Sequence, residues 1–277
     1  MTQVNLHKSV LLVKPNYPGH YKGVIYAGIG YIAEILEQNG ISYKMIDMEF
    51  GYKMKQVLQH IKLNDISLVG VSMMTFKFKD TYQIITAIKS AYPEIKTVVG
   101  GPHVSTMREE VLQVCNAIDY GVIYEGEMTM LELCQGKPQE EIKGLIYRNG
   151  EEIIYTGDRV LESNLDGFPF PKYRKFELDK YSGAIPLVSS RGCPYNCIYC
   201  HVKNVMGRDV RLRSVTNFVD EIEYWCLRGR KRQGIADDNF TFYRNHVIEI
   251  CEEISSRNLT GLNLILGNGV RADRVDR

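Results

Sequence analysis

The chain has 277 residues, of which 44% are hydrophobic, and its 34 basic and 33 acidic side chains give a net charge of +1. This composition is that of a globular protein with room for about two domains, and it excludes a disordered or fibrous chain. The balanced charge predicts neither nucleic acid nor an anionic membrane as a partner, and no apolar run approaches the roughly 20 residues that span a bilayer. Because the N-terminus lacks an apolar leader, we expect a cytoplasmic protein.

Short apolar runs alternate with amphipathic stretches from Ser9 to about Cys134. The predicted strands are 10–13, 42–46, 67–71, 96–99 and 118–123, and two of the predicted helices are 26–38 and 79–92. Strands that alternate with helices form right-handed βαβ units around a parallel sheet. The sequence therefore predicts an α/β fold in which residues 1–140 form a doubly wound parallel sheet of five strands in flavodoxin-like order.

A connector with a different pattern follows. Residues 142–148 and 151–155 flank Asn149-Gly150, which predicts a hairpin with a type I′ turn because both residues tolerate a positive φ. The segment Phe168–Pro171 contains two prolines, which favour extended backbone. We therefore assign residues 141–182 to a hairpin and a linker.

Alternation of strands and helices resumes after the linker. The predicted strands are 185–189, 233–236 and 263–266, and the predicted helices are 215–227 and 246–257. These elements make residues 183–277 the last domain.

Three of the seven cysteines, Cys193, Cys197 and Cys200, lie close together directly after a predicted strand. Thiolates are the soft ligands that iron–sulfur clusters require, and a short loop can wrap three of them around one cluster. Two alternatives use the adjacent His201: a closed structural zinc site, or a c-type haem attached at Cys-x-x-Cys-His. The remaining cysteines are scattered, and an odd total argues against a disulfide framework.

The segment Ser190–Cys200 resembles the signature of radical S-adenosylmethionine (SAM) proteins. Residues 235–241 and 268–273 are similar to the segments that end the second and third strands of that family's barrel. Residues 144–150 and 164–171 are similar to the connector of members that carry an N-terminal cobalamin-binding domain. The resemblance covers nearly the whole chain and implies a cobalamin-binding domain followed by a radical SAM β/α barrel.

For the last domain, the resemblance implies that the three thiolates hold a 4Fe–4S cluster whose fourth iron binds SAM. The reduced cluster would then cleave SAM to a radical that abstracts hydrogen from the substrate. By the same resemblance, the backbone of Tyr199 would meet the adenine, and Asp238 and Asn239 would lie near the methionine end, where the family more often has Gly-Gly-Glu. Arg271 is a candidate for the SAM carboxylate, with an ion pair to a nearby aspartate such as Asp273 as the alternative.

Parallel sheets bind ligands at the carboxyl ends of their strands, near the point where strand order reverses. The loops there resemble those of cobalamin-binding domains, and Gly100-Gly101 lets the backbone approach a ligand closely. His20 stands like the family's cobalt-ligating histidine, but Pro18 replaces its aspartate partner, so we favour cobalamin bound without a protein imidazole. The candidate cofactor-binding residues of this domain are Ser72, Met74, Thr75, Gly100, Gly101, His103, Glu125, Gly126 and Glu127.

Together these features predict a cobalamin-dependent radical SAM enzyme. The leading hypothesis is a methyltransferase for an unactivated carbon or phosphorus centre, with a small-molecule substrate and an external electron donor of the flavodoxin or ferredoxin type. The alternatives are a cobalamin radical SAM enzyme that cyclises or rearranges its substrate, and a non-catalytic cobalamin-binding module. The family's usual barrel has six β/α units and only three strands are predicted here, so we expect a C-terminally shortened chain with little or no turnover.

Overall fold

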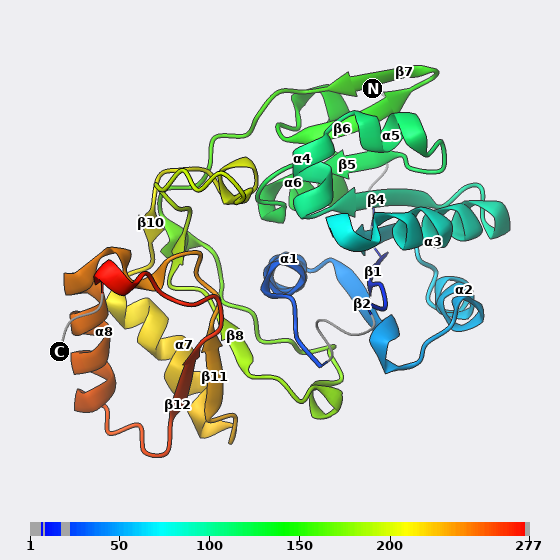
Figure 1. Cartoon of the computed structure of the whole chain (residues 1–277). Helices are drawn as coiled ribbons and strands as arrows, with labels where there is room; N and C mark the ends of the chain where they lie inside the picture. The colour runs from blue at the N-terminus through cyan, green and yellow to red at the C-terminus, as the bar shows by residue number, and fades with distance from the viewer. Residues whose placement is uncertain (1–6, 8, 18–22, 275–277) are drawn as a thin grey trace. The chain divides into compact units, whose positions relative to one another are not determined.

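The computed structural model describes residues 7, 9–17 and 23–274 (Figure 1). The contacts within the chain divide it into two compact units. The first unit contains residues 1–23, 28–160 and 171–181, and the second contains residues 24–27, 161–170 and 182–277. In the described part of the chain, no helix combines the length and the hydropathy that a membrane-spanning segment needs.

A seven-stranded sheet forms the centre of the first unit, in the order β2-β1-β3-β4-β5-β6-β7. The parallel strands are β1 (Ser9–Lys14), β2 (Ser42–Asp47), β3 (Leu68–Ser72), β4 (Lys96–Gly100) and β5 (Tyr120–Val122). Two antiparallel strands, β6 (Leu145–Asn149) and β7 (Glu152–Tyr155), extend it. The predicted flavodoxin-like order is confirmed, and the predicted hairpin belongs to the same sheet.

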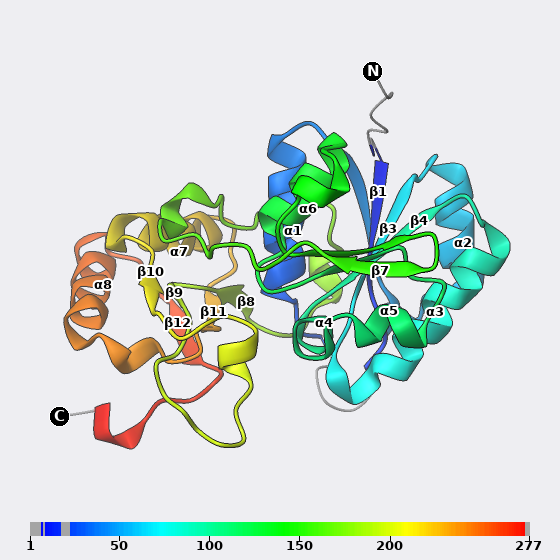
Figure 2. The same ribbon diagram turned by 90° about the horizontal axis from the view of Figure 1, so that it is seen from above.

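Helices cover both faces of this sheet (Figures 1 and 2). Helices α1 (Ala27–Gln38) and α6 (Glu127–Gln135) lie on one face, and α2 (Met54–Leu63), α3 (Phe78–Ala91) and α5 (Glu110–Val114) lie on the other. The short helix α4 (Pro102–Met107) follows β4. Because side chains of a strand alternate between faces, Leu11 and Val13 join the buried cluster of α2 and α3, whereas Leu12 lies near Met130 of α6.

The hairpin of β6 and β7 has a different turn from the predicted one. Asn149 pairs with Glu152, so the two-residue loop is Gly150-Glu151, and only Gly150 has a positive φ, of 64°. A type I′ turn requires positive φ at both central residues, whereas glycine at the first position alone is typical of type II′. The type I′ prediction is therefore wrong, because Asn149 ends the strand instead of entering the turn.

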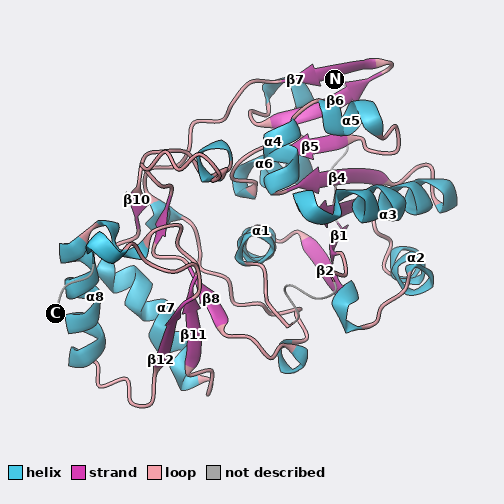
Figure 3. Ribbon diagram, in the orientation of Figure 1, coloured by secondary structure: helices cyan, strands magenta, loops and turns pink. Residues whose placement is uncertain are grey.

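The second unit contains a parallel sheet in the order β12-β11-β8 (Figure 3). Its strands are β8 (Ile185–Leu187), β11 (Arg232–Ile235) and β12 (Asn263–Leu266), and its helices are α7 (Val215–Leu227) and α8 (Arg244–Ser256). An antiparallel pair, β9 (Ser190–Arg191) and β10 (Arg211–Leu212), frames the loop that carries the three clustered cysteines. All three strands predicted after the linker are present in one parallel sheet.

Helix α7 begins and ends where the sequence predicts. The hydroxyl of Ser214 accepts a hydrogen bond from Asn217 N at 3.2 Å, which caps the first turn. Inside the unit, Arg213 and Glu221 form a buried ion pair. Arg213 also donates to Val188 O at 3.0 Å, so this pair ties α7 to the segment that follows β8.

Candidate functional site

The carboxyl ends of β3, β4 and β5 bring most of the predicted cobalamin-site residues of the first unit to one edge of the sheet. Ser72 is in register with Gly100, and Gly100 is in register with Val122, so the loops that follow these strands begin side by side. Strand order reverses between β1 and β3, next to the same loops. This edge is where a doubly wound sheet binds its ligand.

Gly100 ends β4 and Gly101 follows it, and the backbone requires glycine more strictly at one of these positions than at the other. Gly101 has a φ of 112°, and a Cβ there would lie 3.0 Å from Met73 O. A Cβ on Gly100 would lie in ordinary contact with Val122, at 3.7 Å from its Cβ and 3.8 Å from its carbonyl oxygen. Close packing that requires glycine is thus found at Gly101, against the backbone of Met73. Met73 O also accepts a hydrogen bond from His103 N at 3.2 Å.

His103 presents a polar atom at this edge. Its ring is buried and stacks on Phe78, with ring centroids 4.7 Å apart and an interplanar angle of 12°. Burial lowers the pKa of His103, although Glu110 opposes this shift, and the lowered pKa favours the neutral imidazole. Its Nδ1 has no hydrogen-bond partner among the described residues. Because buried polar atoms are normally paired, this nitrogen is suited to a bound ligand.

The other predicted residues of the first unit lie in the loops of the same edge. Met74 is partly buried, and Thr75 is exposed at the start of a 3-10 helix, Thr75–Lys77. Glu125 and Glu127 are both buried, and α6 begins at Glu127, where an acidic residue is favoured by the helix dipole. Gly126 lies between them; a Cβ there would lie 3.3 Å from Val122 Cγ1. His20 lies outside the described residues.

Sequence reasoning missed a charged cluster at this edge. Lys14 Nζ lies 2.9 Å from Asp47 Oδ2 and 2.7 Å from Glu49 Oε2, and all three side chains are buried. Tyr181 OH donates to Asp47 Oδ2 at 2.8 Å. Burial raises the pKa of Asp47, and the hydrogen bond from Lys14 opposes that shift. The available signal was a lysine that directly ends an apolar strand.

In the second unit, Cys193, Cys197 and Cys200 lie on the loop between β9 and β10, and each is partly exposed. Cys200 N donates to Cys197 O at 3.0 Å, which turns the loop back on itself. Gly192, directly before the first cysteine, has a φ of 93°, and a Cβ there would collide with the backbone carbonyl of Asp209. The loop conformation therefore requires glycine at this position.

The described residues contain no group of three histidine, cysteine, aspartate or glutamate side chains arranged to hold a metal ion. The donor set nevertheless fits an iron–sulfur cluster, since three thiols share one short loop. Burial raises the pKa of the Cys193 thiol, and the charges of Asp238, Cys200 and Cys197 raise it further. A bound cation beside Cys193 would oppose this rise in pKa and favour the thiolate.

Asp237, which sequence reasoning passed over for its two successors, fixes the base of the cysteine loop. It is buried and accepts hydrogen bonds from Ser189 N at 2.7 Å, Ser189 Oγ at 2.5 Å and Ser190 Oγ at 2.7 Å. Asn268 Nδ2 donates to Ala236 O at 3.0 Å and to Asp237 O at 3.1 Å. These bonds join the carboxyl ends of β11 and β12 to the strand that leads into the loop.

The predicted Asp238 and Asn239 lie at the same end of β11. Burial raises the pKa of Asp238, and a hydrogen bond from the Gly192 amide opposes this shift. The side chain of Asn239 is buried, and its Nδ2 has no hydrogen-bond partner among the described residues. Asp238 therefore places a carboxylate beside the cysteine loop, and Asn239 adds a buried amide at the same end of β11.

Arg271 and Tyr199 are exposed, whereas Asp238 is partly buried and Asn239 is buried. Arg271 forms the alternative ion pair, with Nε and Nη2 at 3.0 and 3.1 Å from the two carboxylate oxygens of Asp273. Its guanidinium also lies 4.0 Å from the centroid of the Tyr195 ring, which belongs to the cysteine loop. Tyr199 is 87% exposed, so it makes little contact with the rest of the chain.

Residues 23–134 match the family model of the B12 binding domain. The chain is 29% identical over 265 residues to an uncharacterized methyltransferase of Pyrococcus horikoshii, an alignment that covers 90% of this chain and 58% of that protein. It is 31% identical over 280 residues to the anaerobic magnesium-protoporphyrin IX monomethyl ester cyclase of Rubrivivax gelatinosus, covering 90% of this chain and 48% of that protein.

Two solved structures share the fold. One is the radical SAM methyltransferase TsrM of Kitasatospora setae, with a TM-score of 0.74 and 23% identity over 91% of this chain and 51% of that chain. The other is the cobalamin-dependent SAM radical enzyme OxsB, with a TM-score of 0.79 and 20% identity over 94% of this chain and 38% of that chain. These findings confirm the predicted resemblance to cobalamin-dependent radical SAM proteins and the α/β fold class. The chain spans about half the length of the curated relatives it matches.

Proposed function

We propose that this chain is a cobalamin-dependent radical SAM enzyme that transfers a methyl group to an unactivated carbon or phosphorus centre of a small molecule. The observation that carries the proposal is the loop of Cys193, Cys197 and Cys200, which lies in the unit with the parallel sheet β12-β11-β8. In the same chain, the first unit contains the residues that match a B12 binding domain. The relative from Pyrococcus horikoshii is named a methyltransferase, which supports methyl transfer.

The first unit would hold cobalamin at the carboxyl edge of its sheet. The backbone of Gly100-Gly101 and the loop after Ser72 would lie against the corrinoid, with Met74 and Thr75 beside it. The Nδ1 atom of His103, buried and without a partner among the described residues, would hydrogen-bond a polar group of the ligand. The segment Glu125–Glu127 would border the same site.

The second unit would hold a 4Fe–4S cluster through the three thiolates, with SAM beside it. The backbone of Tyr199 would contact the adenine, Asp238 and Asn239 would bind the methionine end, and Arg271 would reach the SAM carboxylate if its bond to Asp273 opened. When bound, these cofactors supply the radical and methyl-transfer chemistry, and the protein residues bind and orient them. An electron donor of the flavodoxin or ferredoxin type would reduce the cluster.

A second candidate is a cobalamin radical SAM cyclase, which the relative from Rubrivivax gelatinosus supports by its name. Both candidates need reduced thiols. All seven cysteines are free, and we accordingly propose a reducing, cytoplasmic location.

The test is anaerobic reconstitution with iron, sulfide and hydroxocobalamin, followed by incubation with isotopically labelled SAM and a reductant. S-adenosylhomocysteine that appears only with cobalamin present supports methyl transfer. Formation of 5′-deoxyadenosine without S-adenosylhomocysteine favours the cyclase. A chain that binds neither an iron–sulfur cluster nor cobalamin contradicts both candidates.

A further inference from the structure

The last residue of β1 is a buried lysine that contacts two buried carboxylates. The side chain of Lys14 is 1% exposed, and those of its partners Asp47 and Glu49 are 2% and 5% exposed. Desolvation of such a group offsets much of its Coulomb attraction, so a buried ion pair is weak evidence for a role in stability. A cluster of this kind at the ligand-binding edge of a sheet points to a role in the site itself.

Glu49 divides its two oxygens between two partners. Its Oε2 contacts Lys14 Nζ at 2.7 Å, and its Oε1 accepts a hydrogen bond from Gly23 N, also at 2.7 Å. Asp47 orients Glu49 as well, because Asp47 Oδ1 accepts a hydrogen bond from Glu49 N at 3.0 Å. Lys14 thus holds the Glu49 carboxylate and Asp47 holds the Glu49 backbone, while the carboxylate accepts the hydrogen bond from the Gly23 amide.

Gly23 belongs to the connection between β1 and α1. At the start of this connection, Tyr17 OH donates to Ser72 O, the end of β3, at 3.1 Å, and the Tyr17 ring packs edge-on against Phe76. Near its end, Gly23 is bound to Glu49. Tyr17 and Gly23 are therefore both bound at the carboxyl edge, beside the point where strand order reverses. This point is where a doubly wound sheet binds its ligand.

We propose that Glu49 is a positioning residue for the corrinoid: held by Lys14 and Asp47, it fixes the Gly23 amide at the ligand-binding edge. This inference rests on the proposed function, because it assumes that cobalamin binds at that edge. Glu49 acts through the Gly23 amide and needs no contact with the reacting atoms. Without this anchor, Gly23 would have to be ordered by the ligand, which would cost affinity.

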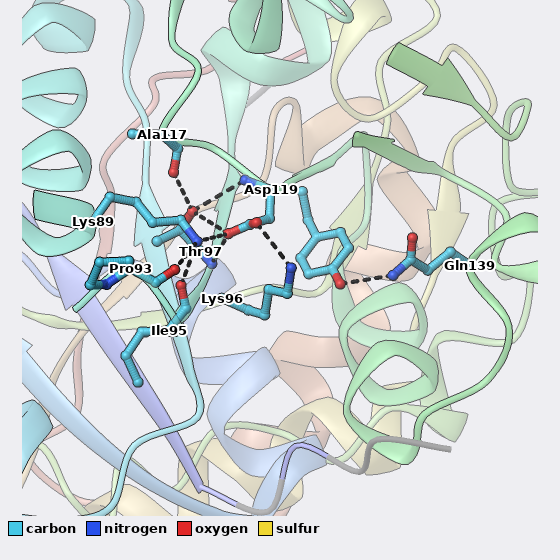
Figure 4. Close-up of polar contacts among 9 residues, drawn as sticks. Lys89, Pro93, Ile95, Lys96, Thr97, Ala117, Asp119 and Gln139 are labelled. Carbon is cyan, nitrogen blue, oxygen red and sulfur yellow. Dashed lines mark hydrogen bonds and ion pairs between the residues drawn. The ribbon is translucent and has the colours of Figure 1, made fainter. Parts of the chain in front are cut away.

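Asp119 provides a matched control at the opposite, amino-terminal edge of the sheet. Like Glu49, it accepts a hydrogen bond from a backbone amide, Thr97 N at 2.8 Å, and contacts a lysine, Lys89 Nζ at 2.8 Å. Figure 4 shows this carboxylate between Lys89, Lys96 and Thr97. Its removal disturbs the same kinds of contact in the same unit without touching the proposed site.

The experiment compares Glu49→Ala, Glu49→Gln and Asp119→Asn by titration with hydroxocobalamin and by hydrogen exchange of the Gly23 amide. We expect Glu49→Ala to weaken binding about tenfold or more, because it removes a charge-assisted hydrogen bond. Glu49→Gln keeps an acceptor for Gly23 N and should lose less affinity, with the Gly23 amide still protected. Asp119→Asn should lower the unfolding temperature and leave the Kd within about twofold, because distant sites act independently.

The outcomes are distinguishable. A wild-type chain that binds cobalamin and a Glu49→Ala variant that binds it equally well would overturn this inference alone. An Asp119→Asn variant that loses as much affinity as Glu49→Ala would also overturn it, because the effect would then follow general stability. A folded wild-type chain that does not bind hydroxocobalamin would contradict the proposed function, and this inference with it.

Discussion

Asp237 accepts two hydrogen bonds from Ser189, one from the backbone amide at 2.7 Å and one from the hydroxyl at 2.5 Å. The aspartate follows β11 and the serine follows β8, so the pair joins the carboxyl ends of two neighbouring parallel strands. Ser189 directly precedes β9, which leads into the cysteine loop. The loop that would hold the cluster therefore depends on a buried carboxylate.

Asp237→Asn should weaken the hydrogen bonds that hold the start of the cysteine loop. An amide nitrogen in place of one oxygen cannot accept hydrogen bonds from the Ser189 and Ser190 hydroxyls, and the loss should be about 1–3 kcal/mol in the free energy of unfolding. Urea denaturation measures this loss, and an iron assay after reconstitution should show a lower cluster content. The control is Asp220→Asn, whose exposed ion pair with Arg257 should contribute less than about 1 kcal/mol. Equal losses in the two variants would refute the role of Asp237.

Gly101→Ala and Gly100→Ala should differ. At Gly101, alanine meets both an unfavourable φ of 112° and the carbonyl of Met73, so we expect a cost of about 1–3 kcal/mol and weaker hydroxocobalamin binding. At Gly100, the added Cβ has ordinary space within the protein, and the stability should change little. Thermal unfolding and a cobalamin titration check the pair, and a larger effect at Gly100 would count against this geometry.

Asp119 should make the first unit sensitive to acid. Burial opposes its ionisation, but hydrogen bonds from Lys89 and Thr97 outweigh burial and hold the pKa of Asp119 below its ordinary value. A depressed folded-state pKa stabilises the protein above the ordinary value, and this contribution is lost as the pH falls through the folded-state pKa. Asp119→Asn should therefore be least stable relative to wild type near neutral pH, and the difference should shrink in acid. Urea unfolding across this pH range measures it, and a difference that does not change with pH would argue against the assignment.

Glu221→Ala should destabilise the second unit strongly. Glu221 is fully buried against Arg213, and its removal leaves an uncompensated buried charge at a cost of about 3–5 kcal/mol. Glu223→Ala is the control on the same helix, because Glu223 is half exposed and contacts Arg257 at 2.9 Å. Urea denaturation of the two variants measures the loss in the free energy of unfolding. Similar losses would show that the buried pair contributes no more to stability than the exposed one.

The strands and the cofactor motifs could be predicted because their signals are local. The apolar run 10–13 is continuous, as expected of a strand buried on both faces, and both it and the predicted strand 96–99 lie within an observed strand. The helix over 215–227 has a serine cap and an amphipathic pattern, and it was predicted at its observed bounds. The three cysteines lie within one loop, as their short spacing in the sequence predicts.

The residues that support the site could not be predicted because their partners are distant in sequence. Lys14 and Asp47 are 33 residues apart, and Ser189 and Asp237 are 48 apart. Sequence pattern also could not tell which of the two neighbouring aspartates, Asp237 or Asp238, carries the hydrogen bonds to β9, because that depends on where β11 ends.

The most direct test of the account is cluster loading of the reconstituted chain. After anaerobic reconstitution, the wild-type protein should hold about four irons and four sulfides per chain, with the broad visible absorbance of a cysteine-ligated cluster. The variant with Cys193, Cys197 and Cys200 all replaced by alanine should hold none, while Cys251→Ala, which alters an exposed cysteine outside the loop, should load like wild type. A full cluster in the triple variant would contradict the central claim.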